Sequence, residues 1–231
     1  MSTTELSALE ANIRYSFQQK DLLKLALTHS SYANEHKLGR LCYNERLEFL
    51  GDAALELVIS KFIYNRFPQM PEGELTKLRA SVVCEGSLAA KAREVALGDF
   101  LRLGKGEDAT GGRKRESVLA DAFEAVIGAV LLDGGMEAVE TYILQLMTDV
   151  VEEKKLHFRD MDYKTKLQEI IQKHSKVPLV YKIVGEEGPD HGKEFFATVT
   201  HEERLLGRGK GHSKKEAEQN AAKAALEDMA L

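Results

Sequence analysis

The spacing of apolar residues changes once along this chain, and that change constrains its fold more than any other feature. Up to residue 156 the apolar residues recur at intervals of three and four, which is typical of amphipathic helices, and no run alternates as a β-strand does. From residue 162 onward the order is a helix, three runs rich in β-branched and aromatic residues, and a last helix rich in alanine. The sequence therefore predicts a multidomain protein, in which an all-α domain precedes a small α+β domain of α-β-β-β-α order.

The predicted domain limits follow from the same change of spacing. We expect the all-helical domain at residues 1–156, a linker at 157–161 and the α+β domain at 162–231. In the second domain turn residues separate the strands, and two helices are expected to cover one face of the sheet. The strands are predicted at 179–184, 194–200 and 204–208, and the last helix at 214–229.

A glycine-rich segment at 104–116 lies inside the helical domain. It lacks the residue order of a phosphate-binding P-loop, so we interpret it as a mobile loop. Its basic run, Arg113, Lys114 and Arg115, is consistent with contact to phosphate and also with a charged surface in solvent. The role of this run stays open on the sequence alone.

Composition excludes several classes of protein. No apolar run approaches the ~20 residues that span a bilayer, and the N-terminus lacks the basic and apolar regions of a secretory signal. Neither cysteine, Cys42 or Cys84, belongs to a CxxC pair, which fits a reducing cytosol and argues against structural zinc. We therefore expect a cytoplasmic protein without membrane contact. The net charge of −5 does not point to nucleic acid, but between Arg204 and Lys215 there are five basic residues and no acid, and such a patch can bind a polyanion.

Acidic residues line one side of a helix that is predicted to begin with Asn44 as its N-cap. Glu45, Glu48 and Asp52 fall within about a 60° arc of this helix, opposite its apolar side. A solvated acidic face would explain the stripe by itself, so the stripe alone does not establish a site.

The helix predicted at 117–132 is apolar on nearly every side, which is typical of a buried helix. Its only ionisable residues are Asp121 and Glu124, which share a face because they are three residues apart. Burying unpaired carboxylates is costly unless Arg or Lys partners, or a bound cation, compensate their charge. An all-oxygen set made by these two residues with Glu48 and Asp52 suits Mg²⁺ or Mn²⁺ and suits zinc poorly. Such a site can activate water for phosphodiester hydrolysis without a covalent intermediate.

The last helix is predicted to begin at a capping box made by Ser213 and Glu216. Its first turn then combines free backbone N–H groups, the positive end of the helix dipole, and the side chains of Lys214 and Lys215, which together suit phosphate. An ordinary capped helix with two solvated lysines would have the same sequence. Glycines at 207, 209 and 211 are interpreted as positions where the backbone approaches a ligand closely.

Two further contact sets would flank this turn. His191 lies in the turn at 188–192, whose tip can enter a shallow groove, although a plain turn histidine is equally consistent. Thr165, Gln168 and Glu169 lie on the exposed side of the helix that begins at 162, where they can bond 2′-hydroxyls and base edges. Three contact sets, two of them flanking a basic one, fit two RNA minor grooves and the phosphates between them.

Two motifs and one whole domain now point to a family. Residues 44–52 (Asn-Glu-Arg-Leu-Glu-Phe-Leu-Gly-Asp) resemble the signature of bacterial ribonuclease III, and residues 116–125 (Glu-Ser-Val-Leu-Ala-Asp-Ala-Phe-Glu-Ala) resemble its second acidic motif. Residues 162–229 resemble a double-stranded-RNA-binding domain, with motif matches at 188–191 and 213–218. The resemblance covers nearly the whole chain in the family's order.

The resemblance implies a Mg²⁺-dependent endoribonuclease, with Mn²⁺ as a substitute and no organic cofactor. The enzyme would be a homodimer whose helical domains form one valley with two cutting sites. It would hydrolyse double-stranded RNA to 5′-phosphate and 3′-hydroxyl ends with two-nucleotide 3′ overhangs. The expected substrates are ribosomal RNA precursors and other structured transcripts, including messenger and transfer RNA.

The resemblance also implies roles for individual acids. The metal ligands would be Glu48, Asp121 and Glu124. Asp52 would orient or activate the attacking water, and Glu124 would also be needed for catalysis. Glu45 and Glu72 match further acidic positions of the family, as dimer-interface or outer-shell groups. Two other interpretations remain open, namely an RNA-binding protein with a degenerate nuclease domain and a helical metal-binding scaffold with an unrelated appendage.

Overall fold

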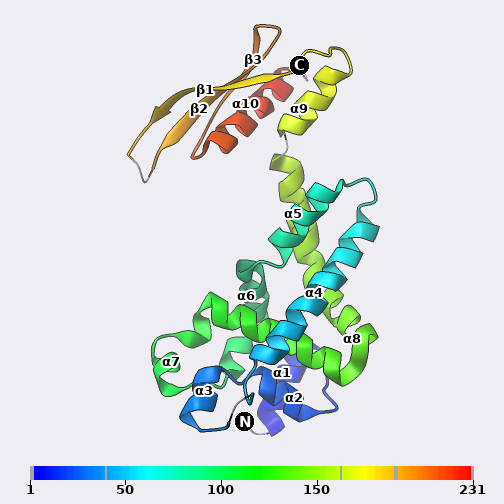
Figure 1. Ribbon diagram of the computed structural model, residues 1–231, viewed down its shortest axis with the longest axis vertical. Helices are drawn as coiled ribbons and strands as arrows, with labels where there is room; N and C mark the ends of the chain where they lie inside the picture. The colour runs from blue at the N-terminus through cyan, green and yellow to red at the C-terminus, as the bar shows by residue number, and fades with distance from the viewer. Residues whose placement is uncertain (1–2, 40, 162, 190–191, 230–231) are drawn as a thin grey trace. The chain divides into compact units, whose positions relative to one another are not determined.

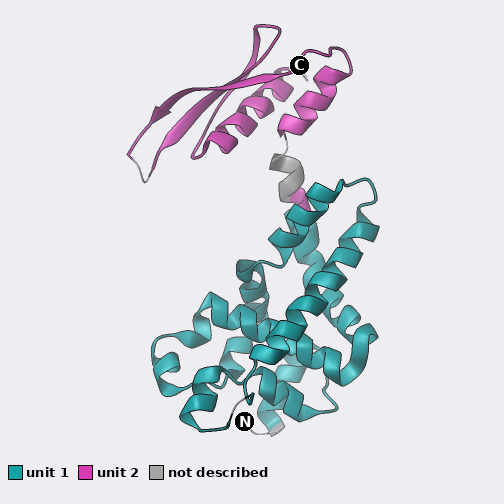
Figure 2. Ribbon diagram, in the orientation of Figure 1, with its two compact units in different colours: residues 1–154 teal, residues 155–231 magenta. Residues whose placement is uncertain are grey.

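The chain divides into two compact units, Met1–Lys154 and Lys155–Leu231 (Figure 2). The computed structural model describes residues 3–39, 41–161, 163–189 and 192–229. The predicted fold class is confirmed, because a helical unit precedes a small unit in which a helix, three antiparallel strands and a last helix follow one another (Figure 1). None of the described helices combines the length and the apolar character that a membrane crossing requires.

The first unit is built from helices of very different length. They are α1 (Thr3–Ile13), α2 (Lys20–Ala26), α3 (Ser30–Glu35), α4 (Glu45–Arg66), α5 (Glu72–Val82), α6 (Glu85–Glu94), α7 (Lys105–Ala109) and α8 (Glu116–Met161), with 3-10 turns η1 (Leu97–Phe100) and η2 (Gly112–Lys114). In the described part of this unit, β-type pairing is limited to a single bridge between Thr28 and Arg102. That bridge lies close to the start of α4, since the backbone N–H of Asn44 donates to the Thr28 carbonyl at 2.9 Å.

Helix α4 carries the acidic stripe and packs its other side into the core. Buried apolar residues recur along it from Leu47 to Ile63 at helical spacing, and the helix ends before Pro68, as proline requires. Asn44 stands at the N-cap position of this helix, as predicted, but its side chain does not cap it. Its backbone is already helical (φ −72°, ψ −20°), its side chain makes no capping hydrogen bond, and it is buried instead.

Helix α8 contains the helix predicted at 117–132 and a second helical segment that follows it. The break between them is a kink at Gly135, whose φ of 77° lies in the region that favours glycine. The segment before the kink is buried on nearly every side, as predicted, although Leu132 at its end is 52% exposed. The segment after the kink continues to Met161, so the predicted linker at 157–161 is helical and lies within the second unit.

The glycine-rich segment at 104–116 is not the mobile loop that its composition suggests. It folds into α7 and η2, and the guanidinium of Arg113 ties them together. Arg113 donates to both carboxylate oxygens of Asp108, at 2.8 and 3.1 Å, and to the carbonyls of Gly98 and Leu101, at 3.1 and 2.7 Å. Arg115 is paired with Glu107. The basic run is therefore largely committed to holding its own segment, and sequence reasoning missed these partners because they are set by tertiary packing.

The second unit is a three-stranded antiparallel sheet in the order β1-β2-β3, with α9 (Tyr163–Gln172) and α10 (Lys214–Met229) packed on one face (Figure 1). The first and third strands run three residues beyond their predicted ends, and the second runs one residue beyond. They are β1 (Val180–Glu187), β2 (Glu194–His201) and β3 (Arg204–Gly211). Leu167 of α9, Ala197 and Val199 of β2, and the alanines of α10 form the buried core between sheet and helices.

The glycines of β3 serve packing and not ligand approach, so that interpretation of the sequence is wrong. A Cβ at Gly207 would lie 2.3 Å from the carbonyl oxygen of Ala221, and a Cβ at Gly209 would lie 2.1 Å from the backbone nitrogen of Ala221. Because real side chains do not tolerate such distances, glycine at alternate positions of β3 is what allows α10 to lie directly against the strand.

Candidate functional site

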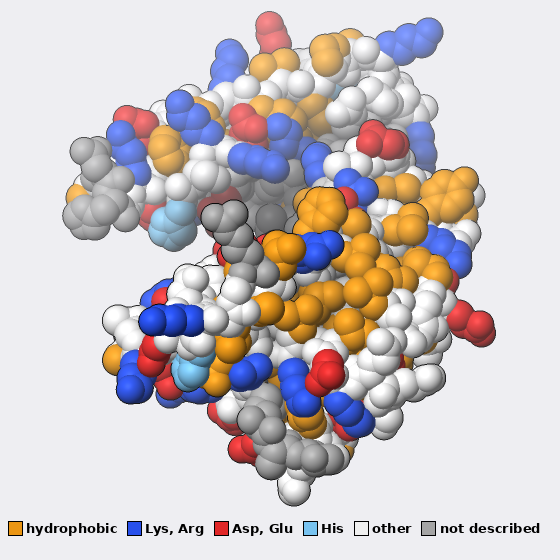
Figure 3. Space-filling model, turned by 60° about the horizontal axis from the view of Figure 1, so that its bottom comes forward, with side chains coloured by type: hydrophobic (Ala, Val, Ile, Leu, Met, Phe, Trp, Pro, Cys, Tyr) orange, Lys and Arg blue, Asp and Glu red, His pale blue; other side chains and the backbone are white. Residues whose placement is uncertain are grey.

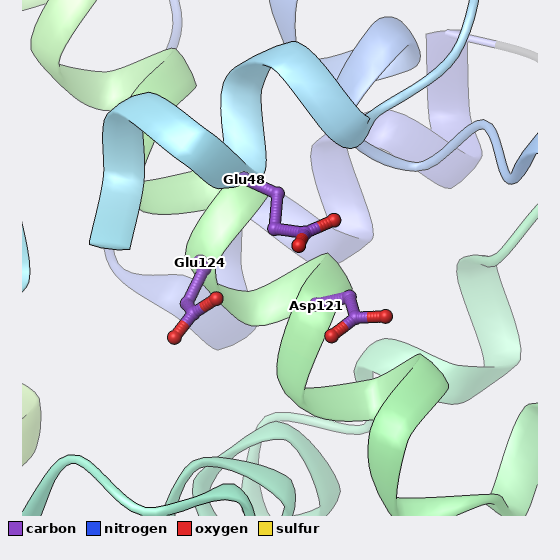
Figure 4. A group of neighbouring side chains, drawn as sticks. All are labelled: Glu48, Asp121 and Glu124. Atoms are coloured by element: carbon purple, nitrogen blue, oxygen red, sulfur yellow. The ribbon is translucent and has the colours of Figure 1, made fainter. Parts of the chain in front are cut away.

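Three carboxylates from two helices converge in the first unit. Glu48 of α4 and Asp121 and Glu124 of α8 each offer an oxygen, and these oxygens all lie within 4.8 Å of one another. Figure 4 shows Glu48 reaching from α4 towards the segment of α8 that carries the other two. All three side chains are half-buried, which places them at the edge of the core and within reach of solvent.

The two helices meet without side chains between them, and this close crossing brings the acids together. A Cβ at Gly51 of α4 would lie 1.8 Å from the backbone carbonyl oxygen of Glu124. A Cβ at Gly128 of α8 would lie 2.1 Å from the carbonyl oxygen of Leu47. Because glycine has no Cβ at these two positions, the backbones of α4 and α8 can approach each other closely. The carboxylates next to the crossing are therefore also close together.

Mutual repulsion and burial make this cluster unfavourable without a counter-charge. Burial, followed by the charges of Asp52 and Glu48, raises the pKa of Glu124 from 4.5 to about 8. Burial and neighbouring acids also raise the pKa of Asp121 and of Glu48. Among the described residues, no ion pair reaches any of the three carboxylates. The Arg or Lys partners that would explain these acids structurally are therefore not found there.

A divalent cation fits this donor set. Three half-buried carboxylate oxygens within 4.8 Å of one another, uncompensated by any described cation, are the ligands that hard ions such as Mg²⁺ and Mn²⁺ prefer. Burial and then the neighbouring negative charges raise the pKa of each acid, and a bound cation would compensate those charges.

The remaining predicted acids lie around this cluster or away from it. Asp52 is exposed on α4, outside the three-carboxylate group, yet its charge contributes to the raised pKa of both Glu48 and Glu124. Glu45 is exposed, and its charge contributes in the same way at Glu48 and Asp121. Glu72 lies in the first turn of α5 and accepts a hydrogen bond from the Thr76 hydroxyl at 2.9 Å.

Three residues outside the predicted site also act on the cluster. The charge of Glu85, in the first turn of α6, raises the pKa of Asp121, whereas His29 lowers it. Glu56 contributes to the raised pKa of Glu124. The spacing puts Glu56 on the stripe of α4, but the sequence alone favours a surface acid there because Glu56 matches no motif of the family. Glu85 and His29 are brought near by tertiary packing, for which the sequence carries no local signal.

The predicted RNA-contact residues of the second unit occupy two separate elements. Thr165, Gln168 and Glu169 are exposed along α9, at spacings that put them on one side of the helix. Ser213, Lys214 and Lys215 are exposed at the start of α10. His191 lies outside the described residues.

Ser213 caps α10 as predicted, and Glu216 reaches back beyond Ser213 to the preceding residue. The backbone N–H of Glu216 donates to the Ser213 hydroxyl at 3.1 Å, and the Glu216 carboxylate accepts from the backbone N–H of His212 at 2.8 Å. The Lys214 ammonium lies 5.9 Å from the centroid of the Phe195 ring. The first turn of α10 thus presents two lysines beside N–H groups that the helix itself leaves unpaired.

Family models match both units. Residues 19–150 match a model described as Ribonuclease-III-like, and residues 163–229 match one described as Double-stranded RNA binding motif.

Two curated relatives are similar along nearly their whole length. A protein named Ribonuclease 3 from Oceanobacillus iheyensis is 51% identical over 226 residues, which cover 97% of this chain and 98% of that relative. A protein of the same name from Desulforamulus reducens is 49% identical over 225 residues, which cover 97% of this chain and 92% of that relative.

A solved structure agrees with the first unit. The nuclease domain of ribonuclease III from Campylobacter jejuni is 42% identical, with a TM-score of 0.58, and the match covers 62% of this chain and 96% of that one. That nuclease domain is described as structurally flexible in a region involved in dimer formation.

Proposed function

Because this chain belongs to the ribonuclease III family and is an endoribonuclease of double-stranded RNA, we propose that it is Mg²⁺-dependent, with Mn²⁺ as a substitute, and needs no organic cofactor. The products would be 5′-phosphate and 3′-hydroxyl ends with two-nucleotide 3′ overhangs. The observation that carries the proposal is the group of three half-buried carboxylates that no described cation compensates. A degenerate nuclease would not need to retain this costly arrangement.

The three acids of the cluster and the neighbouring Asp52 have different parts in this proposal. Glu48, Asp121 and Glu124 would hold the divalent cation, which would lower the pKa of a bound water and stabilise charge on the phosphate. Asp52 is exposed beside the cluster, close enough for its charge to act on Glu124, so it can accept a hydrogen bond from the attacking water and orient it.

The second unit supplies most of the affinity for the RNA duplex. We assign phosphate contacts to Lys214, Lys215 and the Ser213-capped turn, and minor-groove contacts to the exposed side of α9. The contacts on α9 are Thr165, Gln168 and Glu169. His191 completes the set as a contact to a second minor groove.

A homodimer is supported by the outer side of α4. Phe49, Leu57 and Tyr64 are 79%, 58% and 70% exposed, and their spacing puts them on one side of this helix. Figure 3 shows hydrophobic side chains gathered on one face of the molecule, which is typical of a surface covered in an assembly. The Campylobacter jejuni nuclease domain, to which the first unit is similar, is likewise described as having a region involved in dimer formation. Glu45 and Glu72 would then be dimer-interface or outer-shell acids.

The proposed domains are residues 1–156 and 162–231, and the helical residues 157–161 form the linker between them. The proposed setting is the cytoplasm, where two exposed free cysteines would stay reduced. The proposed substrates are ribosomal RNA precursors and other structured transcripts, including messenger and transfer RNA.

The test is cleavage of a long RNA duplex by the full chain, with and without Mg²⁺, using Glu124→Gln and the matched control Glu137→Gln. Glu137 is an exposed acid on the same helix, so its variant makes the same chemical change away from the cluster. We expect cleavage only with Mg²⁺, a loss of at least about 100-fold in Glu124→Gln, and unchanged duplex binding. Wild-type cleavage by Glu124→Gln would overturn the metal-site assignment, and binding without cleavage by the wild type would favour a degenerate nuclease.

A further inference from the structure

The basic stretch from Arg204 to Lys215 looks continuous in sequence, but the sheet divides it between two surfaces. Gly207 and Gly209 face α10, because a Cβ at either position would collide with the backbone of that helix. Side chains alternate between the two faces of a strand, so Arg208 and Lys210 point to the opposite face. These two residues therefore do not belong to the phosphate-binding turn at the start of α10.

The face to which they point, the open face, is the one that α9 and α10 leave uncovered (Figure 1). Its residues follow from the pairing register, since Tyr181, Ile183, Ala197 and Val199 face the helices. The open face comprises Val180, Lys182 and Val184 of β1, Phe196, Thr198 and Thr200 of β2, and Leu205, Arg208 and Lys210 of β3.

A row of positive charge crosses the middle of this face. Lys182 pairs with Thr198, and Thr198 pairs with Arg208, so the two cations stand on either side of a hydroxyl, two strand spacings or about 10 Å apart. Both cations are exposed, and within the described ranges neither takes part in an ion pair. Lys210 is the next residue of β3 on the same face; its side chain is 65% exposed and forms an ion pair with Glu194 at 3.3 Å. Unpaired charge is therefore concentrated in the central row.

An aromatic ring lies directly beside that row. Phe196 is the strand partner of both Lys210 and Gly185. A Cβ at Gly185 would lie 3.8 Å from the ring of Phe196, so the ring rests over a position where β1 has no side chain. The ring is half-buried and has no aromatic neighbour among the described ring contacts, which leaves part of it open to solvent. A ring supported from below beside cations is suited to stacking of an unpaired base.

These features distinguish between the possible forms of RNA. A flat sheet face has no projecting element that could enter the groove of a duplex, whereas unpaired bases can spread over it and stack. The same unit binds double-stranded RNA, so a single-stranded extension of a bound duplex is held at high local concentration near this face. An acidic protein segment is a different possible occupant, but nothing would hold it there, so RNA is favoured.

We propose that the open face, through Lys182, Arg208 and Phe196, is a second RNA-binding surface that takes single-stranded RNA flanking the bound duplex. It lies on the side of the sheet opposite the helices, and it does not require cleavage. It recognises phosphate and base faces without reading sequence, and it adds to the affinity of substrates that carry unpaired extensions.

The experiment compares a blunt RNA duplex with the same duplex carrying a single-stranded extension of about ten nucleotides. Binding to the full chain is measured by fluorescence anisotropy in EDTA, so that no strand is cut. We expect the extension to tighten wild-type binding by about 3- to 10-fold. The double variant Lys182→Gln with Arg208→Gln should lose that gain and still bind the blunt duplex within about 2-fold of wild type. Its salt dependence on the extended duplex should fall by about one to two ion equivalents.

Three variants separate the proposal from its alternatives. Lys173→Gln with Lys176→Gln removes the same charge from exposed positions between α9 and β1, and it should keep the gain. Phe196→Leu should reduce the gain while leaving both lysines and the arginine in place. Lys214→Ala with Lys215→Ala should weaken blunt and extended duplexes equally, and that outcome tests the duplex surface alone.

Two results would overturn the proposal. In one, the extension gives the wild type no gain, which would leave an acidic protein segment as the better occupant. In the other, the double variant at Lys182 and Arg208 weakens blunt and extended duplexes by the same factor. Circular dichroism melting of each variant establishes that the sheet has folded.

Discussion

Removing the charge of Glu124 should stabilise the metal-free protein, although it abolishes the proposed metal site. The folded state raises the pKa of this carboxyl from 4.5 to about 8, through burial and then through the charges of Asp52 and Glu48. A carboxyl with a raised pKa contributes stability that is fully present below its ordinary pKa and is lost as the pH rises through its folded value. The free energy of unfolding without metal should therefore fall between about pH 4.5 and about pH 8.

The size of this effect follows from the same shift. At about 1.4 kcal/mol per pKa unit, a rise from 4.5 to about 8 corresponds to roughly 4–5 kcal/mol at high pH. Glu124 is only half-buried, so solvent screening reduces the expected loss to about 1–3 kcal/mol. Glutamine keeps the shape of the side chain and has no charge to desolvate. Glu124→Gln should then be more stable than wild type by about 1–3 kcal/mol at pH 8.5 and nearly equal to it at pH 4.5.

The assay is urea denaturation of both proteins in EDTA across this pH range, followed by circular dichroism, with Glu137→Gln as the control. The control should show no pH-dependent gain, because Glu137 is exposed and distant from the cluster in sequence. Adding Mg²⁺ should stabilise the wild type and should stabilise Glu124→Gln much less. If Glu124→Gln matched or fell below the wild type at pH 8.5 in EDTA, the account of an uncompensated acidic cluster would be refuted.

Two further predictions concern the helix crossing and the outer side of α4. Gly128→Ala should lower the free energy of unfolding in urea by about 1–3 kcal/mol, despite alanine's higher helix propensity, because the new Cβ would lie 2.1 Å from the Leu47 carbonyl oxygen. The control Gly106→Ala should not destabilise the protein, because a Cβ there has nothing within 4 Å. A Gly128→Ala variant as stable as the wild type would contradict the close crossing. Phe49→Asp should weaken self-association by at least about 10-fold in sedimentation, with little change in unfolding, because this ring is 79% exposed; a dimer of wild-type affinity would argue against this surface.

The sequence predicts the elements better than it predicts their partners. The change of period near residue 156 is enough for the fold class, because each element buries its own apolar side at its own spacing. The helix from Lys214 to Met229 begins and ends as expected, since its Ser213 cap is local. The expected mobile loop at 104–116 is instead ordered by Arg113, whose partners reach back to Gly98. No local pattern specifies such contacts.

The acids show the same division. Asp121 and Glu124 attract attention because charge on an all-apolar helix is costly, and that argument needs no knowledge of the partner helix. The approach of Glu48 depends on a crossing that only the folded chain displays. Once the contacts are known, the glycine at position 51 of the signature-like stretch has a physical explanation, because any larger residue would press on the backbone of α8 at Glu124.

Glycine is the residue whose meaning changes most between sequence and structure. In sequence, glycines at alternate positions of β3 look like openings for a ligand, yet Gly207 and Gly209 are filled by the backbone of α10. Because these glycines face α10 and side chains alternate along a strand, Arg208 must point to the uncovered face. The sequence alone had indicated one continuous basic patch. The proposed second RNA surface follows from this corrected role of the glycines. The packing of α10 against Gly207 and Gly209 closes one face of β3, and the positive charge of Arg208 is therefore on the other face.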